Sequence, residues 1–583
     1  MRKYTSGIPK ELSGAEKYYV PQPQPTPQNT HGSTPQYTTA ASSSPKPGNA
    51  APSNVAAAVA GTGEPQAHSF EPVPDPCEPP LCPEQQAAMD LAMAGHNLFI
   101  TGSGGCGKSV LVKALHQMFK ARQQQVHLIA PTGIAAVNIN GRTTWNYAGW
   151  IPKHLTLPFD DLIEKSRATK TWKRLIDTNV LIIDEISMVE NQFFERLGRV
   201  MSFLRREEAQ RNPQRHLEVL GAFGGVQVIC VGDFCQLPPV NPFKNCMICG
   251  KKMEKEKAGR SILSYSCPEG HPEQRTEDNP HGSFRESDKW AFKATEWERC
   301  NFKYVHLKEV HRQTDKKFIR ILQTCRLGKD LSPEDMDLLL NHPSQVDNAT
   351  RLFSRRWQAD DLNTTQLSQL STESHNYWGL DSVSPNGNQD EGQEPLDDKY
   401  TIDLANGLCN GSQGEICGFV PRSRIDCGSE PQRKNYKNDV SGYEVARERF
   451  HRTEQFMTEE GAPDFYPEVQ FNNGQRRVVG PDCTVNELGT KQPYMLISRT
   501  QVPLAPGWAM TIHKSQSLSL DRLIIDLGSV FEKGQAYVAL SRARSLQGLK
   551  IEGTNESMLQ SGLKLDSEVR RFLEELERSS EGN

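Results

Sequence analysis

The sequence predicts an α/β fold in which parallel strands alternate with helices. Short apolar runs at 97–101, 126–130, 180–183 and 226–231 are rich in β-branched residues, as expected for strands buried on both faces of a parallel sheet. Helical stretches separate these runs, and a glycine-rich turn directly follows the first of them. A similar run at 522–527 indicates a second α/β half near the end of the chain.

Size, charge and cysteine content narrow the class of protein. The chain has 583 residues, which is more than one ordinary domain, so we expect several. Its net charge of −4 shows no overall basic bias, and a nucleic-acid role therefore has to be argued from a local site. We find no apolar run long enough for a transmembrane helix and no secretory signal, so we expect no membrane partner and no disulfides among the 14 cysteines.

Composition separates a tail from the first α/β domain. Residues 1–78 are rich in proline, serine and alanine and contain few core-forming side chains, so we expect them to be disordered. The first α/β domain is expected at 79–295. Within it, polar and lysine-rich residues with clustered cysteines predict an insert at 241–290.

The second α/β domain is expected in two parts. The first part, 296–399, ends in an acidic linker, and the second part, 506–583, ends in an amphipathic helix. The interval 400–505 predicts a small inserted β-barrel, interrupted by a charged loop around 430–460. The strands expected in this barrel are 400–404, 414–420, 468–471 and 494–498.

The glycine-rich turn is a complete phosphate-binding loop. It reads GSGGCGKS, follows a predicted strand and begins a predicted helix at 110–121, which is the context that this motif needs. Glycines let backbone N–H groups surround phosphates, Lys108 supplies positive charge to the β- and γ-phosphates, and Ser109 is suited to bind Mg²⁺. The predicted cofactors are therefore ATP and Mg²⁺, bound by Gly102, Ser103, Gly104, Gly105, Cys106, Gly107, Lys108 and Ser109.

Four other polar side chains are candidates for the same site. Asp184 ends a predicted strand and is suited to bind Mg²⁺, and the adjacent Glu185 to position or deprotonate a water molecule. Gln85 precedes the first strand, and its amide matches the hydrogen-bonding edge of adenine. Gln236 follows another buried strand and is placed to sense the γ-phosphate or the attacking water.

The ordered motifs resemble those of the petite integration frequency (Pif) family of DNA helicases, in the RecD-like branch of helicase superfamily one. The resemblance covers roughly residues 80–555 and implies two RecA-like domains with ATP in the cleft between them. The motifs that carry it are GSGGCGKS (102–109), APTGIAA (130–136), IIDEISM (182–188), GDFCQLPP (232–239), HRQTD (311–315), TIHKSQ (511–516) and YVALSRA (537–543).

The resemblance also implies roles for single residues. Arg312 and Arg542 match arginines that reach the γ-phosphate as arginine fingers, which makes hydrolysis depend on domain closure. The expected catalytic residues are then Lys108, Asp184, Glu185, Gln236, Arg312 and Arg542. The residues that match DNA-contacting motifs are Pro131, Thr132, Gly133, Thr511, His513, Lys514 and Gln516.

Three aromatic residues and one serine stand out beside these motifs. Trp145, Tyr147 and Trp150 either stack on DNA bases or pack in a core, and we include the first two in the expected DNA-binding set. Ser517 stands where the family has glycine, so this loop is expected to need another backbone geometry.

The activity that the resemblance implies is 5′-to-3′ ATP-dependent DNA unwinding with translocation on single-stranded DNA. Its implied substrates are duplex DNA and folded DNA such as G-quadruplexes. Its implied setting is DNA repair, recombination and maintenance of telomeres or mitochondrial DNA, in the nucleus or alternatively the mitochondrion, by a protein that is monomeric without DNA.

Three alternative functions stay open at this point. One is a translocase that removes proteins from DNA without processive unwinding, and another is the helicase part of a mobile element's replication protein. The third is a nucleotide-dependent scaffold without catalysis. The complete set of catalytic residues argues against the scaffold.

The insert contains a candidate zinc site. Cys246 and Cys249 have the spacing of a zinc knuckle, and Cys267 and His271 form a looser half-site. Together they would make a tetrahedral structural site of type Cys₃His, with His281 as a rival for the fourth ligand. The alternative is that these are free thiols in a polar loop.

Overall fold

The computed structural model describes most of the chain after the predicted tail. The tail, the expected strand at 400–404 and His271 lie outside the described residues. Those residues are 80–581 with the exception of 259–260, 270–280, 282, 345, 348, 373–374, 385–412, 427, 437–439, 460, 472–473 and 489–494.

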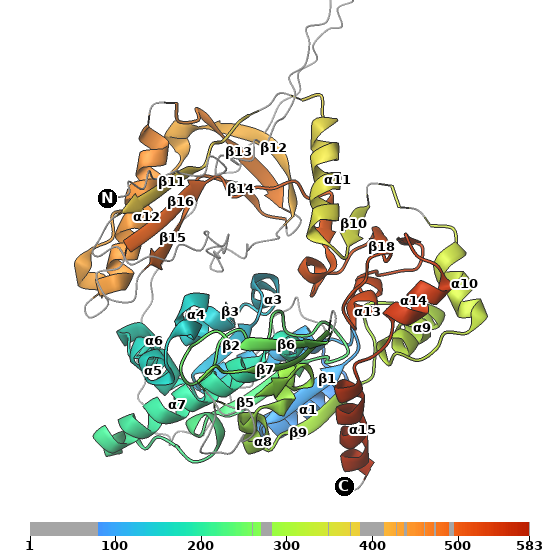
Figure 1. Ribbon diagram of the computed structural model, residues 1–583, viewed down its shortest axis with the longest axis horizontal. Helices are drawn as coiled ribbons and strands as arrows, with labels where there is room; N and C mark the ends of the chain where they lie inside the picture. The colour runs from blue at the N-terminus through green and yellow to red at the C-terminus, as the bar shows by residue number, and fades with distance from the viewer. Residues whose placement is uncertain are drawn as a thin grey trace, which may run out of the picture.

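A six-stranded parallel sheet forms the first half of the molecule (Figure 1). Its strand order is β3-β2-β4-β5-β1-β9. The strands are β1 (Leu98–Gly102), β2 (Val126–Ala130), β3 (Arg142–Thr143), β4 (Val180–Ile183), β5 (Gln227–Gly232) and β9 (Lys303–Leu307). The predicted strands are thus confirmed, and β9 shows that the first sheet continues past residue 295.

Helices cover both faces of this sheet because its strands are apolar on both sides. Leu98 and Ile100 pack toward α1 and α2, whereas Phe99 between them packs toward α7 and α8. The helices of this half are α1 (Pro83–Met93), α2 (Lys108–Ala121), α3 (Gly133–Asn138), α4 (Thr144–Ala148), α5 (Phe159–Ser166), α6 (Thr169–Asp177), α7 (Asn191–Arg211) and α8 (Thr295–Cys300).

A second parallel sheet confirms the other α/β half. Its order is β17-β10-β18-β19, formed by β10 (Thr350–Phe353), β17 (Ala509–Thr511), β18 (Leu523–Asp526) and β19 (Leu549–Glu552). Its helices are α9 (Lys316–Arg326), α10 (Pro333–Asn341), α11 (Arg356–Ser368), α13 (Gln535–Leu540) and α14 (Glu556–Gly562). One continuous apolar cluster includes residues of both sheets.

The predicted C-terminal helix is α15 (Ser567–Glu581), and it packs against the first half of the molecule. Phe572 stacks on Phe292, with ring centroids 4.2 Å apart, and its ring also lies 5.9 Å from that of Phe99. The helix therefore ties the last residues of the chain to the first sheet.

Two separate antiparallel sheets occupy the region of the expected barrel. Strand pairing among the described residues closes no barrel there, so this part of the prediction is not met. One sheet joins β11 (Leu380–Ser384), β16 (Met495–Gln501) and β15 (Asp482–Leu488). The other joins β12 (Gly414–Pro421), β13 (Phe465–Phe471) and β14 (Arg476–Val478).

The charged loop expected around 430–460 was predicted wrongly. Most of it is α12 (Val440–Thr458), which buries Phe456 and Met457 against Tyr466. Arginine and glutamate are good helix formers, so a charged segment with two apolar residues to bury forms a helix rather than a loop.

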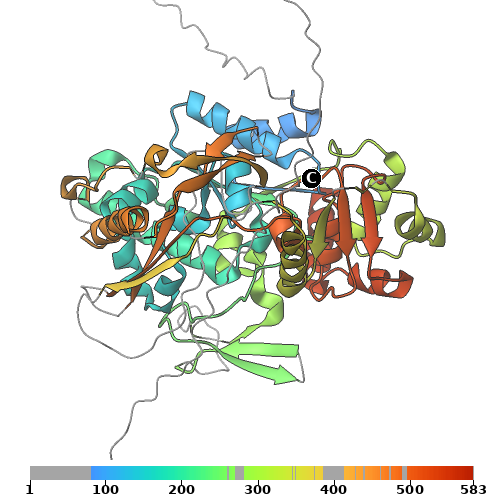
Figure 2. The same ribbon diagram turned by 90° about the horizontal axis from the view of Figure 1, so that it is seen from above.

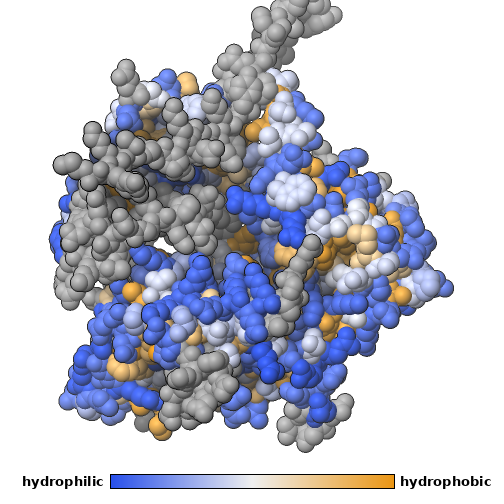
Figure 3. Space-filling model, in the orientation of Figure 1, coloured by the Kyte–Doolittle hydropathy of each residue, from blue (hydrophilic) through white to orange (hydrophobic). Residues whose placement is uncertain are grey.

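The insert forms a small sheet of its own, with antiparallel strands β6 (Glu254–Ala258), β7 (Ser261–Ser266) and β8 (Phe284–Arg285). Figure 2 shows its hairpin projecting from the side of the molecule. The face drawn in Figure 3 is mostly hydrophilic, with hydrophobic residues in small separate areas. Among the described residues, no helix is both long and apolar enough to cross a membrane.

Candidate nucleotide and DNA site

The candidate site lies where strands of the first sheet end. The phosphate-binding loop follows β1, Asp184 and Glu185 follow β4, and Asp233 follows β5. These strands are parallel neighbours in the sheet, so their carboxyl ends share one edge. In parallel α/β sheets this edge is where ligands bind.

The phosphate-binding loop is tightly folded on itself. Gly105 and Gly107 have φ angles of +93° and +77°, a conformation that favours glycine. A Cβ atom at Gly107 would lie 2.4 Å from Gln85 Nε2, so no side chain fits there. Lys108 Nζ donates to the carbonyl oxygens of Gly102 and Ser103, at 2.7 and 2.9 Å. The Lys108 side chain therefore lies across the loop in which it is expected to bind phosphate.

Gln85 is buried beside this loop, as a nucleotide-binding role requires. Its Oε1 accepts a hydrogen bond from the Cys82 amide at 2.9 Å, and its Nε2 donates to Gly107 O at 3.2 Å. A carboxamide has two donor hydrogens and two lone pairs. The arrangement is therefore compatible with a second pair of hydrogen bonds to the edge of adenine.

Asp184 and Glu185 are both buried, and they stand in different environments. Burial and the neighbouring Glu185 carboxylate raise the pKa of Asp184 to about 7. A divalent cation beside Asp184 would favour its charged form, as expected for a Mg²⁺ ligand. Glu185 has a left-handed φ of +51°, which turns its side chain away from the strand direction. Backbone strain at a non-glycine residue is a feature of functional sites.

Glu185 is held by two residues from the second half of the molecule. Gln516 Nε2 donates to one carboxylate oxygen at 3.1 Å, and Ser517 Oγ donates to the other at 2.5 Å. The carbonyl oxygen of Ser517 in turn accepts a hydrogen bond from Asn138 Nδ2 at 3.1 Å. The candidate water-activating carboxylate is thus bonded directly to the motif that matches a DNA-contacting segment.

Ser517, which stands where the family has glycine, has a left-handed backbone conformation. Its φ is +68°, in the region that favours glycine. The expectation that this loop needs another backbone geometry than the family's stays a prediction. The serine hydroxyl provides a hydrogen bond to Glu185 that glycine could not make. Sequence comparison alone identified the departure but not its consequence.

The two expected arginine fingers converge on Ser541. Arg312 donates to the carbonyl oxygen of Ser541 at 2.8 Å, and Arg542 donates to its hydroxyl at 2.8 Å. Burial and the positive charge of Arg312 lower the pKa of Arg542 to about 10, so the Arg542 guanidinium group stays charged at neutral pH. Tyr537 adds a contact to the phosphate-binding loop, where its hydroxyl accepts from Gly104 N at 2.9 Å. The structure therefore brings both arginines to the place where the phosphate-binding loop meets the second half of the molecule, which we call the nucleotide cleft.

A buried ion pair in the cleft was missed by the sequence analysis. Arg326 of α9 forms three hydrogen bonds of 3.0 to 3.2 Å with the carboxylate of Asp233, which is 0% exposed. Burial alone would raise the pKa of Asp233, but the Arg326 guanidinium outweighs it and holds the pKa below its usual value. A signal was present, because Arg326 continues the apolar spacing of Phe318, Ile321, Leu322 and Cys325 along α9.

Three buried glutamines from motifs of the candidate site have unused hydrogen-bonding capacity. Among the residues that the structure describes, the Oε1 atoms of Gln236, Gln313 and Gln516 are buried and make no hydrogen bond. Gln313 Oε1 lies 3.2 Å from where a Cβ atom on Gly105 would stand, so it faces the phosphate-binding loop. Buried polar atoms are normally paired, so each of these atoms is available to water or to a polar ligand.

The candidate DNA-contacting residues lie at the ends of strands in both sheets. Thr132 follows β2 and accepts a hydrogen bond from Ala135 N at 3.3 Å, which caps α3. Thr511 accepts from Lys514 N at 3.4 Å and caps the next turn, while the Lys514 side chain is exposed. His513 packs near Phe531, and burial lowers its pKa, which keeps the imidazole neutral at pH 7. Pro131 and Gly133 are partly buried beside Thr132.

The three aromatic residues that were expected either to stack on DNA bases or to pack in a core differ in their burial. Tyr147 is 0% exposed, and its hydroxyl lies 2.9 Å from Thr178 Oγ1, while Trp150 donates to Ser166 Oγ at 2.9 Å. Both belong to the core, which corrects the expectation that Tyr147 stacks on bases. Trp145 is partly exposed, and its ring lies 5.0 Å from that of Phe193. It alone keeps a face for another partner.

The insert brings Cys246, Cys249 and Cys267 together with His281. His271, the first choice for the fourth position, lies outside the described residues. None of these side chains contacts the phosphate-binding loop in a hydrogen bond among the described residues. The cluster is therefore a separate feature from the nucleotide cleft.

Comparison with known proteins gives consistent matches. A family model described as PIF1-like helicase matches residues 81–251. The ATP-dependent DNA helicase PIF1 of Xenopus laevis is 31% identical over 487 residues, which cover 81% of this chain and 61% of that protein. The ATP-dependent DNA helicase Pif1 of a Psychrobacter species is 31% identical over 516 residues, covering 82% and 68%.

The fold has a counterpart among solved structures. The crystal structure of Pif1 helicase from Candida albicans superposes with a TM-score of 0.61 and 25% sequence identity, covering 86% of this chain and 99% of that one. The chain spans 61 to 62% of the length of the two vertebrate relatives from Xenopus laevis and Danio rerio.

Proposed function

The chain belongs to the PIF1-like helicase family, and we propose that it is an ATP-driven motor that translocates on single-stranded DNA and separates duplex DNA. The relatives' names support this activity, since they are ATP-dependent DNA helicases. The observation that carries the proposal is the pair of hydrogen bonds from Gln516 and Ser517 to Glu185. Through them, a change at the DNA motif moves the group that activates water.

The nucleotide is proposed to bind across the edge of the first sheet. Lys108 would exchange the carbonyl oxygens of Gly102 and Ser103 for phosphate oxygens, which are stronger acceptors because they are charged. Ser109 and Asp184 are the proposed ligands of Mg²⁺, which supplies neutralisation of phosphate charge. Gln85 is proposed to hold the adenine edge.

Hydrolysis is proposed to need both halves of the molecule. Glu185 from the first half positions the attacking water, and Gln236 stands beside it. Arg312 and Arg542 are two positive charges in a buried setting, so negative charge that develops on the transferred phosphoryl group is stabilised strongly there. Because Arg542 is carried by the second half, closure of the halves and hydrolysis depend on each other.

The finer assignments follow the family resemblance. We propose 5′-to-3′ movement, action on duplex and G-quadruplex DNA, and roles in repair, recombination and the maintenance of telomeres or mitochondrial DNA. The proposed compartment is the nucleus, with the mitochondrion as the alternative. The proposed state without DNA is a monomer. Contacts to DNA are assigned to Pro131, Thr132, Gly133, Trp145, Thr511, His513, Lys514 and Gln516.

Two assays on the full chain test this proposal. ATP turnover is measured with and without single-stranded DNA, and strand displacement is measured on duplexes with a 5′ or a 3′ tail. We expect DNA to stimulate turnover and only the 5′-tailed duplex to open, with Lys108→Ala as the inactive control. ATP turnover that does not change when single-stranded DNA is added would contradict the proposed motor activity. Displacement from the 3′ tail alone would overturn only the direction.

A further inference from the structure

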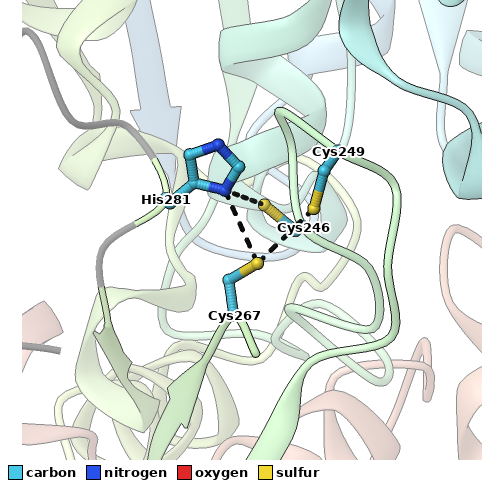
Figure 4. Close-up of side chains that lie close together, drawn as sticks. All are labelled: Cys246, Cys249, Cys267 and His281. Carbon is cyan, nitrogen blue, oxygen red and sulfur yellow. Dashed lines mark hydrogen bonds between the residues drawn. The ribbon is translucent and has the colours of Figure 1, made fainter. Parts of the chain in front are cut away.

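The insert gathers three thiols and one imidazole into a compact cluster (Figure 4). We propose that Cys246, Cys249, Cys267 and His281 bind one structural Zn²⁺ ion, which stabilises the insert. The four candidate ligand atoms, three Sγ atoms and Nδ1 of His281, lie within 4.8 Å of one another. They come from two parts of the insert that are separated in sequence by the β6–β7 hairpin.

The distances fit a tetrahedral zinc centre. His281 Nδ1 lies 3.6 Å from Cys246 Sγ and 3.5 Å from Cys267 Sγ. Zinc–sulfur and zinc–nitrogen bonds of ~2.3 and ~2.05 Å place the sulfur and nitrogen corners of a tetrahedron about 3.6 Å apart. Cys249 Sγ and Cys267 Sγ are 3.5 Å apart, and the tetrahedral sulfur–sulfur edge is about 3.8 Å. Small shifts would therefore complete the site.

The first two ligands lie on a turn of the kind that holds metal-bound cysteines. The Ile248 amide points at Cys246 Sγ, 3.4 Å away, and Gly250 N donates to Cys246 O at 3.0 Å. Gly250 has a φ of +72°, and a Cβ atom there would lie 2.2 Å from Thr156 O. The tight turn and its close approach to the first half of the molecule both require glycine.

The other two ligands flank the edge of the small sheet. Cys267 directly follows β7, and His281 lies three residues before β8. Strands β7 and β8 are paired, with Tyr265 opposite Phe284, so their ends are held close together. This pairing explains why the structure brings His281, the alternative fourth ligand in the sequence analysis, to Cys267. His271 lies outside the described residues.

The surroundings suit a site with net negative charge. Three thiolates, one neutral imidazole and Zn²⁺ sum to −1. The buried Arg196 of α7 brings a guanidinium group close to the cluster, where it donates to Asn245 O, next to Cys246, at 2.9 Å. Asn245 Nδ2 in turn donates to Gly250 O at 2.9 Å. The turn is thus fixed to the helix that follows the Asp184–Glu185 pair.

The insert also has a physical need for a cross-link. Its buried cluster comprises Phe243, Cys246, Met253, Tyr265, Cys267 and Phe284, so two of its six members are themselves candidate ligands. A core of this size contributes little hydrophobic stabilisation, and metal binding adds directly to the free energy of folding. All four coordination positions are filled by protein, so the ion is structural and takes no part in ATP hydrolysis.

Two alternatives compete with the proposed site: a disulfide within the cluster and a metal site elsewhere in the chain. A disulfide between Cys249 and Cys267 would need an S–S distance of about 2.05 Å and would leave Cys246 and His281 unexplained. Among the described residues, one other group of candidate ligands exists, at Cys82, Glu309 and His311, but the last two are exposed. The experiment has to separate these possibilities from the proposed site.

Metal analysis of the full chain, purified without a histidine tag and under reducing conditions, tests the proposal. We expect about one equivalent of zinc in the unaltered protein. Cys246→Ser combined with Cys249→Ser should remove it, and His281→Ala should lower it. Cys417→Ser, at an exposed thiol outside the cluster, and Cys82→Ser should both retain it. His271→Ala, the matched control for His281→Ala, should also retain it.

Two further measurements keep the proposal decidable if a variant fails to fold. Replacement of the metal by Co²⁺ in unaltered protein should give the absorption of a tetrahedral cobalt–thiolate centre, and a chelator should increase hydrogen exchange in 243–267. Zinc below about a tenth of an equivalent in the unaltered protein would overturn the proposal. The proposal would also be overturned if zinc stays bound after Cys246 and Cys249 are both replaced, or if replacement of Cys82 removes it. Cysteines that react with a thiol reagent only after reduction would overturn it as well, because they would be in a disulfide.

Discussion

The nucleotide cleft and the cysteine insert both collect side chains from distant parts of the chain, but they are stabilised in different ways. The cleft lies between two parallel sheets that share one continuous apolar cluster, and it holds the buried ion pair of Asp233 with Arg326. The insert has a small core, and within it His281 Nδ1 lies 3.6 Å from Cys246 Sγ and 3.5 Å from Cys267 Sγ. A large core positions polar groups by itself, whereas a small one needs a cross-link.

The largest effect is expected at the phosphate-binding loop. Lys108→Ala should reduce ATP turnover to the background of the assay, because the charge that meets the β- and γ-phosphates is lost. Binding of single-stranded DNA and the zinc content should stay unchanged, since neither depends on this loop. Lys120→Ala, on the exposed end of the same helix, is the control. Wild-type turnover in Lys108→Ala would contradict the assignment of the loop.

The arginine fingers come next. Arg312→Ala and Arg542→Ala should each lower kcat by roughly a thousandfold or more with little change in ATP affinity, because a finger acts on charge in the transition state. Arg544→Ala is the matched control, since Arg544 is exposed and pairs only with the exposed Asp521 among the described residues. An effect on KM alone would show that the two arginines bind ground-state nucleotide.

The ion pair of Asp233 with Arg326 allows a test of how much a buried charge pair contributes to the stability of the protein. Arg326→Met should lower the free energy of unfolding by about 3–5 kcal/mol, because it leaves the Asp233 carboxylate buried without a partner. The double variant Asp233→Asn with Arg326→Met should recover much of that loss. Denaturant unfolding measures both, with Arg356→Ala in an exposed pair as control. Equal stability of the single and double variants would show that the pair is not coupled.

Ser517 tests the connection between the DNA motif and Glu185. Ser517→Ala should reduce the stimulation of ATP turnover by single-stranded DNA about tenfold, since a hydrogen bond to a charged group contributes ~1.5–3 kcal/mol. Ser519→Ala, two residues away, is the control. Ser517→Gly keeps the favoured backbone conformation and removes the same bond, so it should lose stimulation too. If glycine instead behaves like serine, backbone shape rather than the hydroxyl provides the coupling.

The smallest effect is expected when zinc is removed. Full chain that has been stripped of zinc by a chelator and then freed of the chelator should, with Mg²⁺ present, keep ATP turnover within about twofold of the starting value, because the proposed ion has no open coordination position. Thermal unfolding monitored by hydrogen exchange should show the loss in the insert first. A large fall in turnover that zinc restores would mean that the insert and the cleft are coupled after all.

Much of the cleft could be predicted from the sequence because its signals are local. The phosphate-binding loop, the strand ending in Asp184 and Glu185, and the apolar runs of both sheets are each encoded within about ten consecutive residues. The zinc-knuckle spacing of Cys246 and Cys249 is local in the same sense. Strands β1, β2, β4 and β5 of the first sheet and β18 of the second followed from these signals, whereas β3, β9, β10, β17 and β19 were not predicted.

What only the tertiary structure decided depends on contacts across long separations. Arg326 and Asp233 are 93 residues apart in the sequence, and Ser517 and Glu185 are 332 residues apart. The sequence around Arg326 and Ser517 does not indicate which residue each of them contacts. Burial of Tyr147, like the choice of His281 for the cysteine cluster, is set by how strands and helices pack. Local sequence determines which functional side chains each segment carries. Packing determines which of these side chains come into contact, because a segment could pack against many others until one hydrophobic core excludes the alternative arrangements.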